Sequence, residues 1–279
     1  MRYIKYEVDK KTSVRKFLRE KDFSKRSIDE ILVKGYFVND KLSKKSQELE
    51  TLDKISIIIE DEDLDYKPIK GNIKIVYEDE STLVVSKNAN LTVNSKNQVS
   101  LANYLSYYFK ENNINSKIRL VNRLDMDTSG LMIIAKNKFA HAFYQRQIES
   151  NKMEKKYLAV IEGRHDINIM YEEKFSYDEL SKSYKKDKSG KSARTIFRTI
   201  SNDENKSLIE CKILTGKTHQ IRASLSELGY PIIGDKLYGS EVEMDRFLLH
   251  SYKLSFFDFD KKENINLEDW PNFISFYQK

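Results

Sequence analysis

The sequence predicts an α+β fold, in which a small α+β domain precedes a large domain built on a mixed or antiparallel sheet. Beyond residue 72 the predicted strands outnumber βα repeats, which argues against a doubly wound parallel sheet. Ahead of that residue, two short amphipathic helices and two strands end in a strongly acidic tract. We therefore place one domain at residues 1–62, an acidic linker at 63–71 and a second domain at 72–279.

The small domain begins with two predicted helices. Ser13 can cap the first and Ser24 the second, and Gly35 can end the second. Apolar side chains at helical spacing give each helix one face to bury. These side chains are Val14, Phe17 and Leu18 in the first helix and Ile28, Ile31 and Leu32 in the second. Strands are expected at 36–39 and 55–59.

The large domain alternates strand-like and helix-like apolar patterns. Strands are expected at 73–77, 83–87, 131–135, 156–162, 194–200, 208–214 and 246–257, and helices at 101–109, 139–148, 217–228 and 272–277. The segment 181–198 carries seven Lys or Arg against one Asp and is expected to form a mobile basic loop. Such a loop suits phosphate contacts, although it can equally be a solvated surface loop.

Charge indicates an acidic partner. The 279 residues carry a net charge of +6 and give a pI near 9.0, which makes nucleic acid the first candidate. A genome biased toward Lys would produce the same total, so the distribution is more informative. Residues 1–45 hold 14 Lys or Arg against 7 Asp or Glu, whereas residues 46–65 hold 1 against 8. This asymmetry predicts an oriented basic surface on the small domain.

Several classes of protein are disfavoured. The single cysteine, Cys211, cannot form an intramolecular disulfide and suits a reducing cytosol. The four histidines are scattered and predict no metal site, and the sequence has no phosphate-binding or dinucleotide glycine motif. The start resembles no signal peptide, and no apolar run is long enough to span a membrane. We expect a cytoplasmic monomer that acts through its side chains, without a cofactor and without a membrane.

The most informative segment runs from Leu120 to Asn137. Arg123 and Asp125 stand at the start of a polar turn, 126–130, between two apolar segments. An acid beside a base is therefore held at a tight bend by a rigid scaffold, as functional side chains often are. Asp, Thr, Ser and Gly also favour ordinary hairpin turns, so the segment by itself leaves both interpretations open.

This segment resembles the active-site signature of the RluA-type RNA pseudouridine synthases, usually written HRLD-x-x-TSGLLL-x-AK. The matching residues are Arg123, Leu124, Asp125, Thr128, Ser129, Gly130, Leu131, Ala135 and Lys136. The resemblance implies that Asp125 is the catalytic nucleophile. It also implies that Arg123 enters the base stack as a uridine swings out, although a phosphate contact would suit the same side chain.

Two further segments resemble the other signatures of this family. The run 155–163 matches a motif whose Tyr packs on the target uracil or acts as a general base, and Tyr157 is the matching residue. The run 214–222 resembles TGRTHQIR, and Arg222 takes the place of the Arg that pairs with the catalytic Asp. The planar fork of a guanidinium matches a carboxylate, so we expect Arg222 to orient Asp125.

The small domain resembles the alpha-L RNA-binding module over about 50 residues. The resemblance implies RNA contacts by Arg15, Lys25, Arg26 and Lys34, and the alternative is a charged helical pair that only packs on its neighbour. In the large domain the candidate RNA contacts are Lys191, Lys217 and His219. A structural role near the start of a helix fits His219 as well.

The sequence departs from the family pattern at Asn122, where His is usual, and at Asn88–Asn90, where the proline and glycine of NKPAG are usual. The resemblance still implies a synthase that isomerises uridine to pseudouridine in structured RNA. Large-subunit ribosomal RNA is the first candidate and transfer RNA the second. The departures favour an alternative, a non-catalytic RNA-binding or ribosome-assembly factor that kept the fold. A glycosidase would need a second catalytic carboxylate, which no motif supplies.

Overall fold

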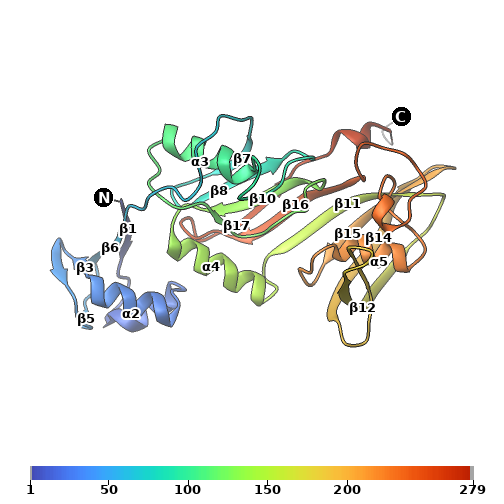
Figure 1. Ribbon diagram of the computed structural model, residues 1–279. Coiled ribbons are helices and arrows are strands. Elements are labelled where there is room, and N and C mark those ends of the chain that lie inside the picture. The colour runs from blue at the N-terminus through green and yellow to red at the C-terminus, as the bar shows by residue number, and fades with distance from the viewer. Residues whose placement is uncertain (1, 277–279) are drawn as a thin grey trace.

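A computed structural model of the chain describes residues 2–276, and Figure 1 shows a small N-terminal unit beside a larger one. Two helices and a four-stranded sheet, in the order β1-β6-β3-β4, form the small unit. Its elements are β1 (Arg2–Glu7), β2 (Thr12–Ser13), α1 (Val14–Glu20), α2 (Lys25–Lys34), β3 (Tyr36–Val38), β4 (Lys41–Ser43), β5 (Glu48–Leu49) and β6 (Lys54–Ile59). The short strands β2 and β5 pair separately from that sheet.

Both helices of the small unit start as the sequence predicts, and α2 also ends as predicted. The side chains of Ser13 and Ser24 accept hydrogen bonds from the third residue beyond each, at 3.4 and 3.0 Å, which satisfies a free helix N–H. Gly35 ends α2 at a φ of 109°, a value that favours glycine. The strands β1 and β4 were not predicted, because their buried side chains are too few for a clear alternation.

The large unit is built on one mixed sheet, which confirms the predicted fold class. Within the described residues this sheet has eleven strands, and only β10 and β16 run parallel to each other. The strands are β7 (Lys74–Glu78), β8 (Thr82–Lys87), β9 (Arg119–Leu120), β10 (Ser129–Ala135), β11 (Glu154–Glu162), β12 (Asn168–Asp178), β13 (Ser183–Lys186), β14 (Lys191–Asn202), β15 (Lys206–Ile213), β16 (Leu249–Phe257) and β17 (Asn264–Glu268).

Helices cover both faces of this sheet. In the part of the chain that the structure describes they are α3 (Leu101–Glu111), α4 (Lys138–Glu149) and α5 (Gln220–Glu227), with short 3₁₀ turns at Lys236–Tyr238 and Asn272–Phe276. Core side chains of α3 and α5 belong to one apolar cluster, and those of α4 to another. Figure 1 accordingly shows α3 and α4 on opposite sides of β8 and β10. Every side chain of β10 is buried, because this strand lies between the two layers.

The structure corrects several predicted elements. The segment 181–198 is not a mobile loop, because it contains β13 and the first part of β14, which both pair with β12. Lysines dilute the alternation of buried side chains in these two strands. Helix α5 begins three residues later than predicted, because His219 adopts a left-handed φ of 53° that interrupts the helical backbone. The strand expected from residue 246 begins at Leu249. Strands β12 and β17 were not predicted.

The two units are packed together. The ring of Phe23 in the small unit lies 5.5 Å from Phe139 and 5.9 Å from Phe259 in the large one, centroid to centroid. Beside these rings, Lys138 of α4 contacts Glu30 at 2.5 Å and Glu60 at 3.1 Å. Glu60 and Glu62, at the start of the acidic tract, pair with cations of both units, so this tract helps to dock the small unit.

The C-terminal helix predicted at 272–277 is a short 3₁₀ turn, Asn272–Phe276, and Tyr277 lies outside the described residues. Its side chains Phe273 and Ile274 are buried in the same apolar cluster as α3. None of the helices within residues 2–276 is both long enough and apolar enough to cross a membrane.

Candidate active site

Asp125 lies on the turn between β9 and β10, at the point where the sequence places a polar bend between two buried segments. Its main-chain carbonyl accepts a hydrogen bond from the N–H of Thr128 at 3.2 Å, which closes the turn. The side chain keeps about a quarter of its surface exposed (28%) and faces a pocket. The carboxylate is therefore fixed by the turn and still accessible to a substrate.

Gly130 sets the position of this turn against the sheet. Its φ is 110°, and a Cβ atom added there would lie 2.3 Å from the carbonyl oxygen of Ser251 on β16. Because side-chain carbon atoms do not approach backbone so closely, only glycine lets β10 and β16 pair at this point. The close approach brings the end of β10, and with it Asp125, against β16.

Lys87 supports the turn from behind. Its side chain is almost fully buried, and Nζ donates hydrogen bonds to the carbonyl oxygens of Asn88, Leu91 and Met126 at 2.7–2.8 Å. Burial lowers the pKa of Lys87 to about 8, against the attraction of Asp127 and Asp125. Lys87 thus joins the loop after β8 to the residue that follows Asp125.

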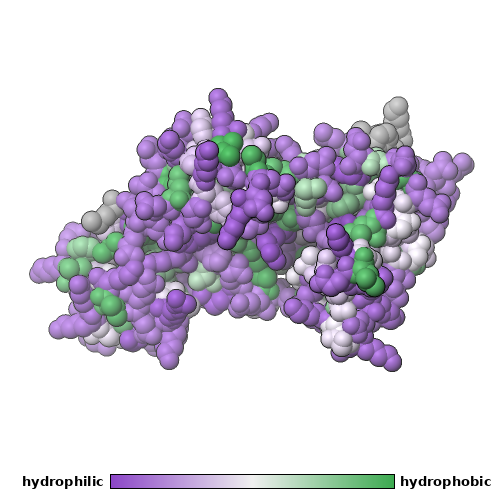
Figure 2. Space-filling model, viewed as in Figure 1, coloured by the Kyte–Doolittle hydropathy of each residue, from purple (hydrophilic) through white to green (hydrophobic). Residues whose placement is uncertain are grey.

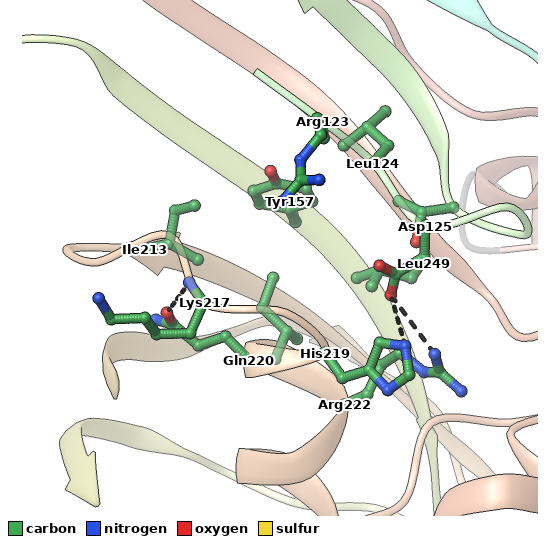
Figure 3. A pocket seen from close by; sticks show the side chains of 12 residues that line it. Arg123, Leu124, Asp125, Tyr157, Ile213, Lys217, His219, Gln220, Arg222 and Leu249 are labelled. Carbon is green, nitrogen blue, oxygen red and sulfur yellow. Dashed lines mark hydrogen bonds and ion pairs between the residues drawn. The ribbon is translucent and has the colours of Figure 1, made fainter. Parts of the chain in front are cut away.

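Arg222, from α5, approaches Asp125 from the other side of the pocket (Figure 3). Its Nη1 lies 3.4 Å from Asp125 Oδ2, whereas Nε and Nη2 donate to the two carboxylate oxygens of Asp235 at 2.7 and 2.9 Å. The guanidinium is also packed between the rings of Tyr238 and Phe247, 4.8 and 4.2 Å from their centroids. The predicted meeting of Arg222 and Asp125 is present, but the two-pronged contact is made with Asp235.

The charges around Arg222 compensate one another. A buried guanidinium needs a compensating charge, and the buried carboxylate of Asp235 supplies it. Burial is the largest single influence and lowers the pKa of Arg222, but the hydrogen bonds with Asp235 and the negative charges of Asp235 and Asp125 together outweigh it, so the pKa is raised. The N–H groups of Nη1 then remain to be offered to Asp125. Asp235 therefore acts as the anchor that orients Arg222.

His219 completes the group around Asp125. Its Nε2 lies 3.9 Å from Asp125 Oδ2, and its Nδ1 lies 3.0 Å from the hydroxyl oxygen of Tyr238. Burial lowers the pKa of His219, an effect that the nearby Asp125 opposes, so the imidazole is neutral at pH 7. The neutral ring is hydrogen-bonded to Tyr238 and only lies near Asp125, which fits the structural alternative better than a phosphate contact.

Tyr157, on β11, forms one wall of the same pocket and is 7% exposed. Burial, followed by the negative charge of Asp125, raises the pKa of Tyr157 above its ordinary value, while a hydrogen bond with Ser251 works in the other direction. The phenol is therefore protonated at neutral pH. It can donate a hydrogen bond or pack against a ring, but a resting general base would have to be deprotonated.

A larger cleft adjoins this pocket. The pocket itself measures about 70 Å³ and the cleft about 580 Å³, and both contain Arg123, Asp125, Tyr157 and Lys217. Figure 2 shows the molecular surface hollowed between the lobe that carries α4 and the lobe that carries α5. The cleft is within the size range of ligand sites, roughly 300–1,000 Å³. It is large enough to receive a ligand next to Asp125.

The other predicted RNA contacts lie in different settings. Arg123 and Lys217 border the cleft, while Lys191 begins β14 outside it. In the small unit Lys25 and Arg26 are exposed at the start of α2. Two others are paired: Arg15 contacts Asp29 at 2.7 Å, and Lys34 contacts Glu30 and Glu60.

Known proteins resemble this chain in both sequence and structure. A family model described as RNA pseudouridylate synthase matches residues 81–227, more than half of the chain. This chain belongs to the RNA pseudouridine synthase family. An uncharacterized RNA pseudouridine synthase of Aquifex aeolicus is 33% identical over 231 residues, which cover 78% of this chain and 73% of that protein. The uncharacterized synthase YhcT of Bacillus subtilis is 34% identical over 198 residues, covering 67% of this chain and 65% of YhcT.

A relative with a named function and a relative with a solved structure agree with this assignment. A ribosomal large subunit pseudouridine synthase D of Borreliella burgdorferi is 32% identical over 228 residues, 76% of this chain and 68% of that protein. The structure of human RNA pseudouridylate synthase domain containing 1 superposes with a TM-score of 0.62 at 25% identity, covering 72% of this chain and 84% of that one. Both the sequence and the fold are therefore those of the synthase family.

Sequence reasoning missed two residues that support this pocket. Asp235 lies beyond the signature 214–222, and nothing in its local pattern indicates that it faces Arg222. Lys87 stands in a stretch that departs from the family pattern, and its three carbonyl partners come from loops that are separate in sequence. Asn122, the other departure, has its amide directed at the backbone of β10, where its oxygen accepts from Ile133 N–H at 2.9 Å. That substitution therefore affects the scaffold of the site.

Proposed function

We propose that this protein isomerises uridine to pseudouridine in RNA and that Asp125 is the nucleophile. The observation that carries the proposal is the Asp125 carboxylate itself, which is fixed on a turn, exposed to a pocket and in contact with Arg222. A carboxylate held in this way can attack a sugar or ring carbon and later leave again. The family to which the chain belongs performs this class of reaction.

The reaction requires no net exchange of atoms with a second substrate. The bond between N1 of uracil and C1′ of ribose breaks, the ring turns, and a bond between C5 and C1′ forms. The proton on C5 is lost and N1 gains a proton. Asp125 would attack either C1′ of the ribose or the uracil ring, or promote elimination to a glycal, and all three routes place its carboxylate beside the departing base.

The other pocket residues have supporting roles in this proposal. Arg222 would orient Asp125 and stabilise its negative charge when the carboxylate is released. Tyr157 would pack against the uracil, and its protonated hydroxyl would donate a hydrogen bond. Arg123, at the edge of the cleft, would fill the space that the flipped uridine leaves in the RNA, or hold a phosphate.

Large-subunit ribosomal RNA is the substrate that we propose first, since relatives of this chain are named as ribosomal large subunit pseudouridine synthases. Transfer RNA is the second candidate. The test is to map pseudouridines in total RNA from cells with and without this gene. We expect a site to disappear from large-subunit RNA, whereas a site lost from transfer RNA would reassign the substrate. An unchanged map would contradict the proposed activity.

A further inference from the structure

The lysine at the start of β11 is unusual among the charged residues of this protein. Lys155 is 8% exposed, yet within the described residues its Nζ takes part in no hydrogen bond or ion pair. Burial alone accounts for the lowered pKa of Lys155, with no carboxylate acting on it. The ammonium itself is not sealed from solvent, so this largely desolvated charge without a counter-charge is available to a partner that binds from the cleft.

The position of Lys155 indicates where that partner binds. Residues two apart on a strand point to the same face, so Lys155 and Tyr157 lie side by side, about 7 Å apart along β11. Both border the larger cleft, but only Tyr157 reaches the small pocket around Asp125. Lys155 is therefore next to the reaction site without touching the reacting atoms.

The surroundings of Lys155 favour an anion. Its Nζ lies beneath the loop between β15 and α5, 3.9 Å from the place where a Cβ atom of Gly216 would be. The residue after that glycine is Lys217, which borders the cleft from the loop. The charged residues around the cleft are three cations, Arg123, Lys155 and Lys217, and one anion, Asp125.

We propose that Lys155 and the adjoining loop form a subsite for a backbone phosphate of the RNA, next to the nucleotide that enters the Asp125 pocket. This inference rests on the proposed function, because RNA is the polyanion that it requires. The phosphate supplies the counter-charge that Lys155 lacks, and its binding holds the flanking nucleotide while the uridine turns. Lys155 is thus a positioning residue for the substrate.

The strand offers a matched control. Lys156 is the next residue on β11 and points to the opposite face, where it contacts Glu210 at 3.3 Å. Lys155→Met and Lys156→Met remove the same charge from neighbouring positions of one strand. Lys155→Arg keeps the charge at the proposed subsite. All three variants are compared with the wild-type protein in binding labelled polyuridylate over a series of salt concentrations.

We expect Lys155→Met to weaken binding several-fold and to reduce the slope of log K against log salt by about 0.7, the loss of one phosphate contact on a single strand. Lys155→Arg should retain most of the affinity, and Lys156→Met should match the wild type. Removing the unpaired charge should also leave the melting temperature of the free Lys155→Met protein unchanged or higher. If Lys155 had a purely structural role, its replacement would instead lower the melting temperature.

Two results would overturn the inference. Equal affinities and salt slopes for Lys155→Met and Lys156→Met would show that no phosphate binds at Lys155. A melting temperature that falls in parallel with affinity would make Lys155 part of the scaffold. The proposed function fails separately, if the map of pseudouridines in total RNA is unchanged by loss of the gene. Binding is measured without isomerisation, so the activity of Asp125 does not affect the outcome.

Discussion

Arg222 is held more firmly by Asp235 than by Asp125, because two of its N–H groups contact Asp235 at 2.7 and 2.9 Å and one contacts Asp125 at 3.4 Å. Asp235→Ala would leave a buried guanidinium without its charge partner. We expect the free energy of unfolding to fall by about 3–5 kcal/mol in urea denaturation. Asp245→Ala, at an exposed aspartate, should change it by less than about 0.5 kcal/mol. Equal midpoints for the two variants would show that Asp235 is not the anchor of Arg222.

The raised pKa of Tyr157 predicts how the reaction rate depends on pH. The phenol stays protonated up to its ordinary pKa of 10.0 and beyond, so it should add no alkaline limb to the pH–rate profile. Tyr157→Phe should therefore lower the single-turnover rate by a similar factor at every pH from about 7 to 10. Tyr157→Ala, which also removes the packed ring, should be slower still. If Tyr157→Phe removed a limb that the wild type has, Tyr157 would be the general base.

At the scale of elements, the pairing of β10 with β16 depends on Gly130. In Gly130→Ala the added Cβ atom meets Ser251 and the backbone keeps an unfavourable φ of 110°, so we expect a loss of at least about 3 kcal/mol in the free energy of unfolding. Gly239→Ala is the control, since φ there is 96° but nothing lies within 4 Å of the new atom. It should cost about 1 kcal/mol. Similar losses in both variants would mean that the close approach to β16 is not limiting.

Which elements could be predicted follows from how locally they are encoded. Helices α1 and α2 carry their caps and apolar faces within a dozen residues, and β10 is a continuous apolar run. These three elements were therefore predicted from the sequence. Strands β1, β12 and β17 lie at sheet edges or alternate weakly, and only their partners stabilise them. The three residues expected around the pocket do meet there, because long signatures carry Asp125, Tyr157 and Arg222. Their supports, Asp235 and Lys87, act through contacts between distant segments that spacing does not encode.

At the scale of the whole molecule, the docking of the small unit depends on the aromatic contact at Phe23. Phe23→Ala removes a buried ring that faces Phe139 and Phe259, which costs about 3–5 kcal/mol. We expect the small unit to undock and the segment 63–71 to be cleaved faster in limited proteolysis, while the large unit stays resistant. Phe37→Ala, at a partly exposed ring of the small unit, is the control. Equal cleavage rates for the two variants would show that Phe23 does not hold the units together.

The most direct test of the account is the Asp125→Asn variant. Asparagine is nearly the same size as aspartate but lacks the negative charge, so it cannot act as the nucleophile. Wild type and variant are incubated with large-subunit ribosomal RNA from cells lacking the gene, and pseudouridine is measured by tritium release. We predict product with the wild type and none with Asp125→Asn, whose melting temperature should be unchanged and whose RNA affinity should stay within a few-fold. Pseudouridine formation by Asp125→Asn would contradict the account.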